Sequence, residues 1–240
     1  QSVSPQVLVV RKAQTDDTAS LLEGENGYST QKTGAVSNLP VIHGLADERV
    51  KVDIDGMGIT SACANHMNAP MSYIAPANVG NVTVYSGGTV PVSVGGDSIA
   101  GTVRIESIPP KFAKKGETLT GGSITVGGRS NGNAVSGNAD VFYADETTNL
   151  SYTKTYSHAD NYQSASSFKA GDGKYTNTVG TSLYEIHTDT VKLAKKAGSD
   201  LYTFSVGRQY IPYQGYPNQY MDMTNNESIM LNMGYLGQFS

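Results

Sequence analysis

The sequence predicts an α+β domain followed by antiparallel strands of the kind that form transmembrane β-barrels. Short elements rich in glycine occupy residues 16–108 of the 240-residue chain. Pro109-Pro110 and the charged residues after them predict a linker over 109–117, because consecutive prolines interrupt helices and strands. From residue 118 onward, long segments alternate apolar and polar side chains, which is the period of a strand with two different faces.

The first domain begins with a helix signal. Asp16 and Asp17 place acidic side chains at the positive end of a helix dipole, and Gly24 ends the short helix predicted for residues 19–23. Residues 1–15 are mostly polar around one apolar run, so we expect a flexible terminus or a first strand there. We also expect short strands at 38–44, 50–55, 79–85 and 102–105.

The second half predicts six strands with one apolar and one polar face. In the fifth of them, Tyr202, Phe204 and Val206 alternate with polar or small residues. A soluble β-sandwich gives the same alternation, so this pattern alone does not separate the two classes. The six strands are expected near 118–129, 136–145, 149–158, 182–194, 200–210 and 226–240.

Loop lengths favour the membrane barrel over the sandwich. Short turns at 145–149 and 195–200 alternate with long loops at 158–181 and 211–225. Outer-membrane barrels have this asymmetry, with short turns on the periplasmic side and long loops outside. A barrel that encloses another domain needs about 22 strands, so we expect these six to be only its first part.

The amino-acid composition argues against several classes of function. The net charge is −4 and charged residues make up 16%, so a nucleic-acid partner is not expected. No window approaches 18 consecutive apolar residues. The acidic residues of the first domain form no catalytic cluster with a nucleophile and a base, so we expect no enzyme. Four of these acids, Glu48, Asp53, Asp55 and Asp97, are expected to pair with arginines such as Arg49 and Arg104.

A cluster of soft donors lies between residues 52 and 73. Cys63, the single cysteine, precedes Met67 by four residues, and a helical turn would put both on one face. Thiolate and thioether are ligands of Cu(I), although a lone cysteine is often only a small apolar side chain. His66 is expected to orient the turn and Met71 to pack, with metal binding as their alternative role.

The loop over 212–226 carries two further methionines, Met221 and Met223. Their spacing suits a transient relay for a soft metal. The favoured alternative is that this loop simply folds over the first domain.

Several motifs of the first domain carry a family resemblance. D-D-T-A-S-L-L, S-N-L-P-V-I-H-G-L-A-D-E-R-V, V-D-I-D-G-M and G-G-D-S-I-A-G-T-V-R-I-E-S follow one another in the chain. In order and spacing they resemble the plug domain of TonB-dependent outer-membrane receptors. C-A-N-H-M-N-A-P-M-S-Y-I and P-V-S-V-G-G-D-S-I resemble the copper receptor subfamily more particularly. The chain departs from that subfamily at His43, where arginine is more common.

The resemblance implies an α+β plug domain inside a transmembrane antiparallel β-barrel, in the outer membrane of a Gram-negative bacterium. It implies a TonB energy-coupling complex and outer-membrane lipid as partners, and copper, favoured as Cu(I), as the transported ion. Cys63 and Met67 would be the copper ligands, completed by a His-x-Met pair that these residues do not contain. His66, Met71, Met221 and Met223 are accessory candidates. Val7, Leu8, Val9 and Val10 form a candidate TonB box.

Two alternatives remain open at this point. The first is a TonB-dependent receptor for a siderophore or another metal chelate, in which Cys63 would be dispensable. The second is a soluble periplasmic or secreted copper-binding β-protein.

Overall fold

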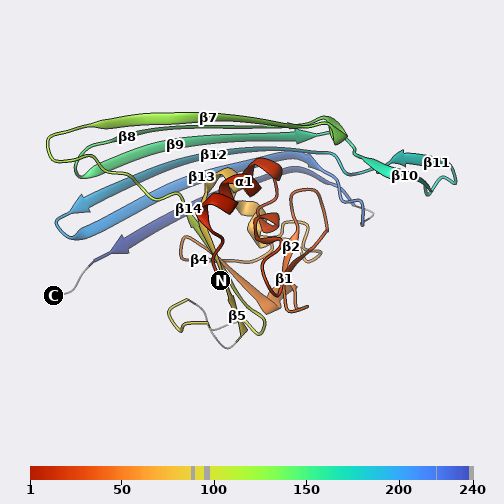
Figure 1. The fold of residues 1–240 in the computed structure, drawn as a ribbon, viewed down its shortest axis with the longest axis horizontal. Coiled ribbons are helices and arrows are strands. Elements are labelled where there is room, and N and C mark those ends of the chain that lie inside the picture. Colours follow the sequence, from red (N-terminus) through yellow and green to blue (C-terminus); the bar gives the residue numbers. More distant parts are fainter. Residues whose placement is uncertain (88–89, 95–97, 220, 238–240) are drawn as a thin grey trace.

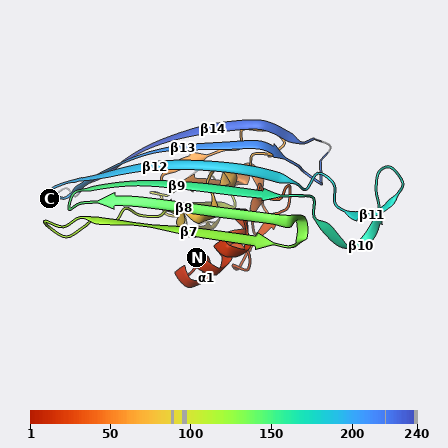
Figure 2. The same cartoon turned by 90° about the horizontal axis from the view of Figure 1, so that it is seen from above.

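The computed structural model describes residues 1–87, 90–94, 98–219 and 221–237. A small mixed domain, here called the plug, packs beneath one face of a long six-stranded antiparallel sheet, here called the wall (Figure 1). Seen from above, the wall strands lie side by side over the plug, with helix α1 near the β7 edge (Figure 2). This arrangement confirms the predicted fold class, a plug domain with part of a barrel. Among the described residues, no helix is long and apolar enough to cross a membrane.

The chain begins with a helix where the sequence analysis expected a flexible terminus or a strand. Helix α1 spans Pro5–Gln14, and the Ser4 hydroxyl caps it by accepting from the Val7 N–H. That expectation of the local structure was wrong because Ser-Pro is a strong helix start, with a capping hydroxyl followed by proline in the first turn. Leu8 is buried in the plug core, and ahead of the helix Val3 N–H donates to the Val82 carbonyl.

The plug is organised around a four-stranded sheet of order β4-β3-β6-β5, in which β3 and β6 are parallel. Its apolar core is continuous from the N-terminus to β6, and Val103 and Ile105 of β6 are fully buried. The predicted helix after Asp17 is a single 3-10 turn, and the four predicted strands of this region are present. The elements are η1 Ala19–Leu22, β1 Tyr28–Gln31, β2 Leu39–Ile42, η2 Asp47–Arg49, β3 Val50–Ile54, β4 Met57–Ile59, η3 Pro70–Tyr73, η4 Pro76–Asn78, β5 Val79–Ser86 and β6 Gly101–Ser107.

All six predicted wall strands are present, in the order β7-β8-β9-β12-β13-β14. One feature was not predicted: the long loop after β9 contains a hairpin, which projects beyond the sheet (Figure 1). The elements are β7 Leu119–Arg129, η6 Asn131–Asn133, β8 Ala134–Ala144, β9 Thr148–Ala159, β10 Gln163–Lys169, β11 Tyr175–Thr178, β12 Tyr184–Ala197, β13 Asp200–Gln214 and β14 Met223–Leu236.

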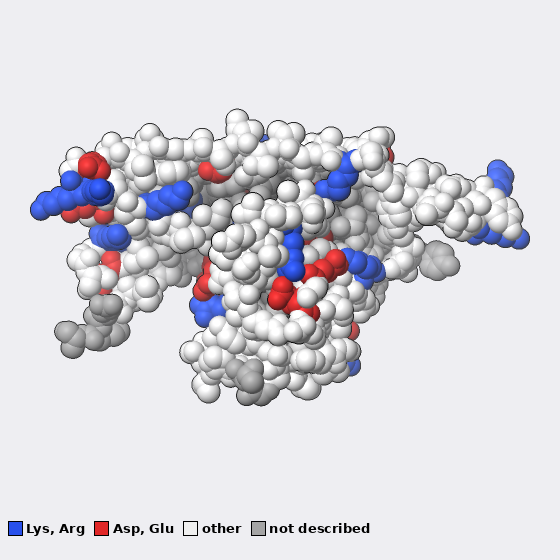
Figure 3. Space-filling view, in the orientation of Figure 1, with Lys and Arg blue, Asp and Glu red and all other residues white. Residues whose placement is uncertain are grey.

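The two faces of the wall differ in polarity. Polar side chains such as Thr188 and Gln209 are buried on the plug side. Exposed apolar side chains occupy the outer face, among them Ile124, Val141, Leu150, Leu231 and Met233. Figure 3 shows lysine and arginine at both ends of the molecule and in patches over the plug, while the upper part of the wall is mostly uncharged. A β-sandwich would cover this apolar face with a second sheet, so the single wall supports the barrel interpretation.

Candidate metal site at the plug turn

Cys63 and Met67 lie on one tight turn of the plug between β4 and η3. The His66 N–H donates to the Cys63 carbonyl over 2.8 Å, and the Ser61 hydroxyl donates to the same oxygen over 3.0 Å. His66 has φ of +54°, a left-handed conformation that stops a helix from continuing. A helical turn that would place Cys63 and Met67 on one face is therefore interrupted at His66. Cys63 is partly exposed, whereas Met67 points into the protein and is only 7% exposed.

His66 contacts acids of the preceding turn. Its Nε2 lies 3.7 Å from an Asp47 oxygen and 3.4 Å from a Glu48 oxygen, with the imidazole four-fifths buried. These contacts hold the turn from the side of η2, which agrees with the orienting role expected for His66.

The expected pairing of plug acids with arginines was wrong for three of them. Asp53 accepts the Gly56 N–H and Asp55 accepts the Ser107 N–H, while Glu48 faces His66. A carboxylate accepts hydrogen bonds, so Asp53 and Asp55 are satisfied by backbone N–H groups without an arginine. Asp97 lies outside the described residues.

The other candidate methionines occupy different surroundings. Met71 is fully buried in the plug core beside the Tyr28 hydroxyl, so its position is that of a packing residue. Met221 is 47% exposed in the β13–β14 loop. Met223 begins β14, and its sulfur lies 3.0 Å from the Asn226 amide nitrogen.

The candidate TonB box, residues 7–10, lies within helix α1. Leu8 faces the plug core, whereas Val9 and Val10 are exposed. The coupling role assigned to this run remains a prediction.

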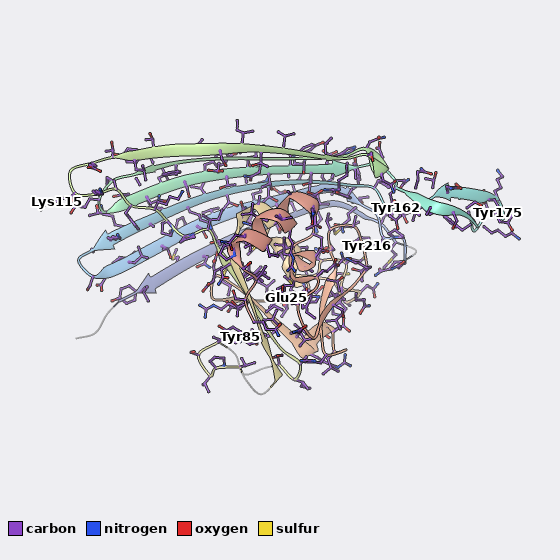
Figure 4. The ribbon with its side chains drawn as sticks, in the orientation of Figure 1. Glu25, Tyr85, Lys115, Tyr162, Tyr175 and Tyr216 are labelled. Atoms are coloured by element: carbon purple, nitrogen blue, oxygen red, sulfur yellow. The ribbon has the colours of Figure 1, made fainter. Side chains whose placement is uncertain are left out.

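The β13–β14 loop folds over the turn that carries Cys63 and Met67. Tyr216 is fully buried, and its hydroxyl donates to the Met67 carbonyl over 2.5 Å. Figure 4 labels Tyr216 where the loop meets the plug beside the wall. Burial raises the pKa of Tyr216 above its ordinary value, and the nearby Cys63 adds to that rise. Tyr216 was not among the predicted site residues, and the flanking Gly215 and Pro217 indicate only a turn in this loop.

The plug meets the wall mainly through polar contacts. Gln209 donates to the Ser72 carbonyl over 2.8 Å, and Asn232 donates to the Asp55 carbonyl over 3.0 Å. Between these contacts lies a cavity of about 60 Å³, lined by plug and wall residues that include Met57 and Met230. A contact made through hydrogen bonds is easier to open than an apolar core, because water can replace the hydrogen bonds that are lost.

A second plug–wall contact lies at the other edge of the sheet. Asp16, directly after α1, accepts from Arg129 over 2.5 Å and from the Tyr184 hydroxyl over 2.6 Å. Arg129 also donates to the Tyr184 oxygen over 2.8 Å, which closes a triangle between the plug and strands β7 and β12.

Hard-metal ligands do not converge in this structure. Within the described ranges, no group of three or more His, Cys, Asp or Glu side chains is arranged to hold a metal ion.

Comparison with known proteins identifies the architecture. Residues 1–102 match the family model described as TonB-dependent Receptor Plug Domain. The fold is a plug domain with part of a β-barrel, as in TonB-dependent receptors. TonB-dependent receptors are transporters, not enzymes.

Solved structures of such receptors share the fold. The copper transporter OprC matches with a TM-score of 0.76 at 21% identity, over 94% of this chain and 32% of that one. The FrpB iron transporter of Neisseria meningitidis matches at 0.67 and 17% identity, over 85% and 31% of the two chains. The Serratia marcescens hemophore receptor HasR matches at 0.71 and 20% identity, over 91% and 32%.

The chain thus spans about a third of the length of these structures. The comparison with curated proteins returns no sequence match.

Proposed function

We propose that this protein is a TonB-dependent transporter of the outer membrane of a Gram-negative bacterium that imports copper as Cu(I). Cys63 and Met67 would be the ligands that the plug contributes. The observation that carries the proposal is the turn itself, which holds a thiol and a thioether within five residues under a loop of the wall. Cu(I) prefers this donor pair, whereas Fe(III) prefers oxygen donors.

Two further observations support this choice of cargo. The copper transporter OprC shares the fold over 94% of this chain. The neighbouring His66 faces Asp47 and Glu48, so it leaves the sulfur pair as the donors available at the turn.

The chief rival is a receptor of the same architecture for a siderophore or haem carrier. FrpB and HasR, which share the fold, are described as an iron transporter and a hemophore receptor. A chelate would be bound by aromatic and basic side chains of the outer loops, and the thiol would have no part in it. Replacing Cys63 therefore separates the two proposals.

A soluble copper-binding β-protein is not favoured. The exposed apolar side chains on the outer face of the wall form a continuous band along several strands, and such a band requires lipid or detergent.

Coupling to the TonB complex would pass through the N-terminal segment, because α1 leads directly to Asp16 and its contact with the wall. A pull on the N-terminus would first load the contacts of Val3 and Leu8 with the plug core, and then the contact of Asp16 with the wall.

The test is a Cu(I) titration of the purified full-length protein against a chromophoric chelator. Wild type should retain one tightly held copper, while Cys63→Ser and Met67→Leu should lose it. Met71→Leu is the matched control, since it removes a thioether from the same region but from a buried core position, and it should bind as wild type does. Stoichiometric, chelator-resistant copper in Cys63→Ser would refute the proposed site.

A further inference from the structure

Tyr216 links the outer loop of the wall to the turn that carries the two sulfur donors. Its side chain has no exposure, and its hydroxyl donates to the carbonyl oxygen of Met67, one of those donors. A distance of 2.5 Å is short for a hydroxyl–carbonyl hydrogen bond. Tyr216 and Met67 are 149 residues apart in the chain, so this hydrogen bond joins two distant segments.

Two glycines make room for this tyrosine. A Cβ at Gly34 would lie 3.0 Å from two atoms of the Tyr216 ring, which is tighter than ordinary packing. A Cβ at Gly215 would lie 2.0 Å from the Thr181 carbonyl oxygen, so the loop passes too close to the β9–β12 loop for any side chain there. The backbone on both sides is therefore shaped to deliver the ring to its place.

Neighbouring loop residues hold the same surface of the plug. Gln214 donates to the Ser37 hydroxyl over 2.9 Å, and Asn218 donates to the Lys32 carbonyl over 2.6 Å. Gln219 donates to the Asn65 carbonyl over 3.4 Å, within the turn itself. These bonds anchor the loop, but only Tyr216 reaches the backbone of a proposed ligand.

We propose that Tyr216 is a positioning residue for the sulfur pair, and that docking of residues 214–219 on the plug and binding of a soft cation at Cys63 and Met67 favour each other. The inference rests on the proposed function. The hydrogen bond fixes the backbone at Met67 and so limits where its thioether can lie relative to Cys63. A bound ion would hold the same turn in the same place and would in turn hold the loop.

Thermodynamic linkage requires that the effect of the loop on ion affinity equal the effect of the ion on loop stability. If the docked loop raises the affinity for the ion by some factor, the ion must raise the stability of the docked loop by the same factor. Losing one buried hydrogen bond to a well-placed partner corresponds to about a tenfold change in an equilibrium constant.

The first experiment compares Tyr216→Phe with wild type in the full-length protein. Phenylalanine keeps the ring and its packing but removes the donor. Cu(I) affinity should fall about tenfold, and X-ray absorption at the copper edge should report fewer sulfur neighbours in the variant, since Met67 is less well placed. Tyr213→Phe is the matched control: it removes a hydroxyl three residues away that bonds to His158 rather than to the plug, and it should leave both readouts unchanged.

The second experiment measures the mobility of the loop backbone. Hydrogen exchange of residues 214–219 should be faster in Tyr216→Phe than in Tyr213→Phe, and adding Cu(I) should slow exchange in wild type. Gly34→Ala, which crowds the ring from the plug side, should reproduce the faster exchange. Wild-type affinity, sulfur coordination and loop protection in Tyr216→Phe would overturn the proposal.

Failure of the proposed function would look different. In that case Cys63→Ser would still hold copper, whatever Tyr216→Phe does. If Cys63→Ser loses copper while Tyr216→Phe binds as wild type, the copper site stands and the positioning role falls.

Discussion

In the plug, the apolar side chains of β3, β5 and β6 point into a closed core, whereas in the wall the apolar side chains point outward and stay exposed. Both regions use the same alternation of polar and apolar residues. The difference lies in which face meets another part of the protein. In the wall that inner face is polar, so plug and wall meet through hydrogen bonds such as Gln209 to Ser72. A contact of this kind holds two bodies in register and still allows them to separate.

The largest expected effect tests the closed core. Leu21 is fully buried in the plug, so Leu21→Ala should lower the free energy of unfolding by about 2–5 kcal/mol, because it removes buried surface and leaves a cavity. Leu231 on the outer face is 61% exposed, and Leu231→Ala should have a much smaller effect. Chemical denaturation of the two variants in detergent measures both. Equal losses would mean that the two regions do not bury apolar side chains in different ways.

Substitution by lysine tests whether the outer face of the wall contacts lipid. Leu231→Lys should destabilise the protein in bilayers by about 2–4 kcal/mol if this residue lies near the middle of the membrane. Leu236, at the end of β14, lies near the short-turn end of the wall, and Leu236→Lys should cost no more than about 1 kcal/mol. Refolding titrations into lipid vesicles provide the values. A similar cost at both positions would argue against a lipid-facing band.

The contact between plug and wall should contribute less to stability than the apolar core of the plug does. Asp16→Asn removes the charge that Arg129 and Tyr184 share, and should lower stability by about 1–3 kcal/mol because Arg129 loses a charged partner that is only 8% exposed. Asp172→Asn, at the tip of the projecting hairpin, is the control, since its lysine contact is exposed. Differential scanning calorimetry should show a loss for Asp16→Asn alone. No loss there would mean that this triangle does not hold the plug.

A smaller effect is expected from a buried acid of the plug. Burial raises the pKa of Asp17 above its ordinary value of 3.8, although Ser20 and Asn38 donate hydrogen bonds that oppose the shift. The folded state therefore binds this proton more tightly than the unfolded state does. Its contribution to stability is complete below the ordinary pKa and is lost as the pH rises through the raised one.

Denaturation at a series of pH values checks this sign. Wild-type stability should fall with rising pH above about 4 relative to that of Asp17→Asn, which cannot titrate. An opposite slope would mean that the hydrogen bonds from Ser20 and Asn38 outweigh burial.

Alternation made the wall predictable from the sequence. The alternation of polar and apolar residues within a strand such as β13 can be seen in a short stretch of sequence. Short and long loops also alternate along the chain, so the six strands and their faces could be predicted. The hairpin β10–β11 was not predicted because its residues are mostly polar and show no regular alternation of polar and apolar side chains.

The site was less predictable because it depends on contacts between distant segments. The residue types at Cys63 and Met67 indicated soft-metal chemistry, but the turn that carries them depends on the left-handed His66, which propensity does not reveal. Tyr216 could not be linked to Met67 from the sequence, since the two lie 149 residues apart and the bond is made to a backbone carbonyl. Helix α1, in contrast, was not predicted, although Ser4 and Pro5 are a local signal for the start of a helix.

The central claim is that the sulfur atoms of Cys63 and Met67 bind the transported ion. The most direct measurement is a crystal structure of the full-length protein soaked with Cu(I), with anomalous diffraction recorded at the copper edge. The account predicts one strong anomalous peak in contact with both Cys63 Sγ and Met67 Sδ, beneath Tyr216. A peak at other residues, with none at this turn, would contradict it.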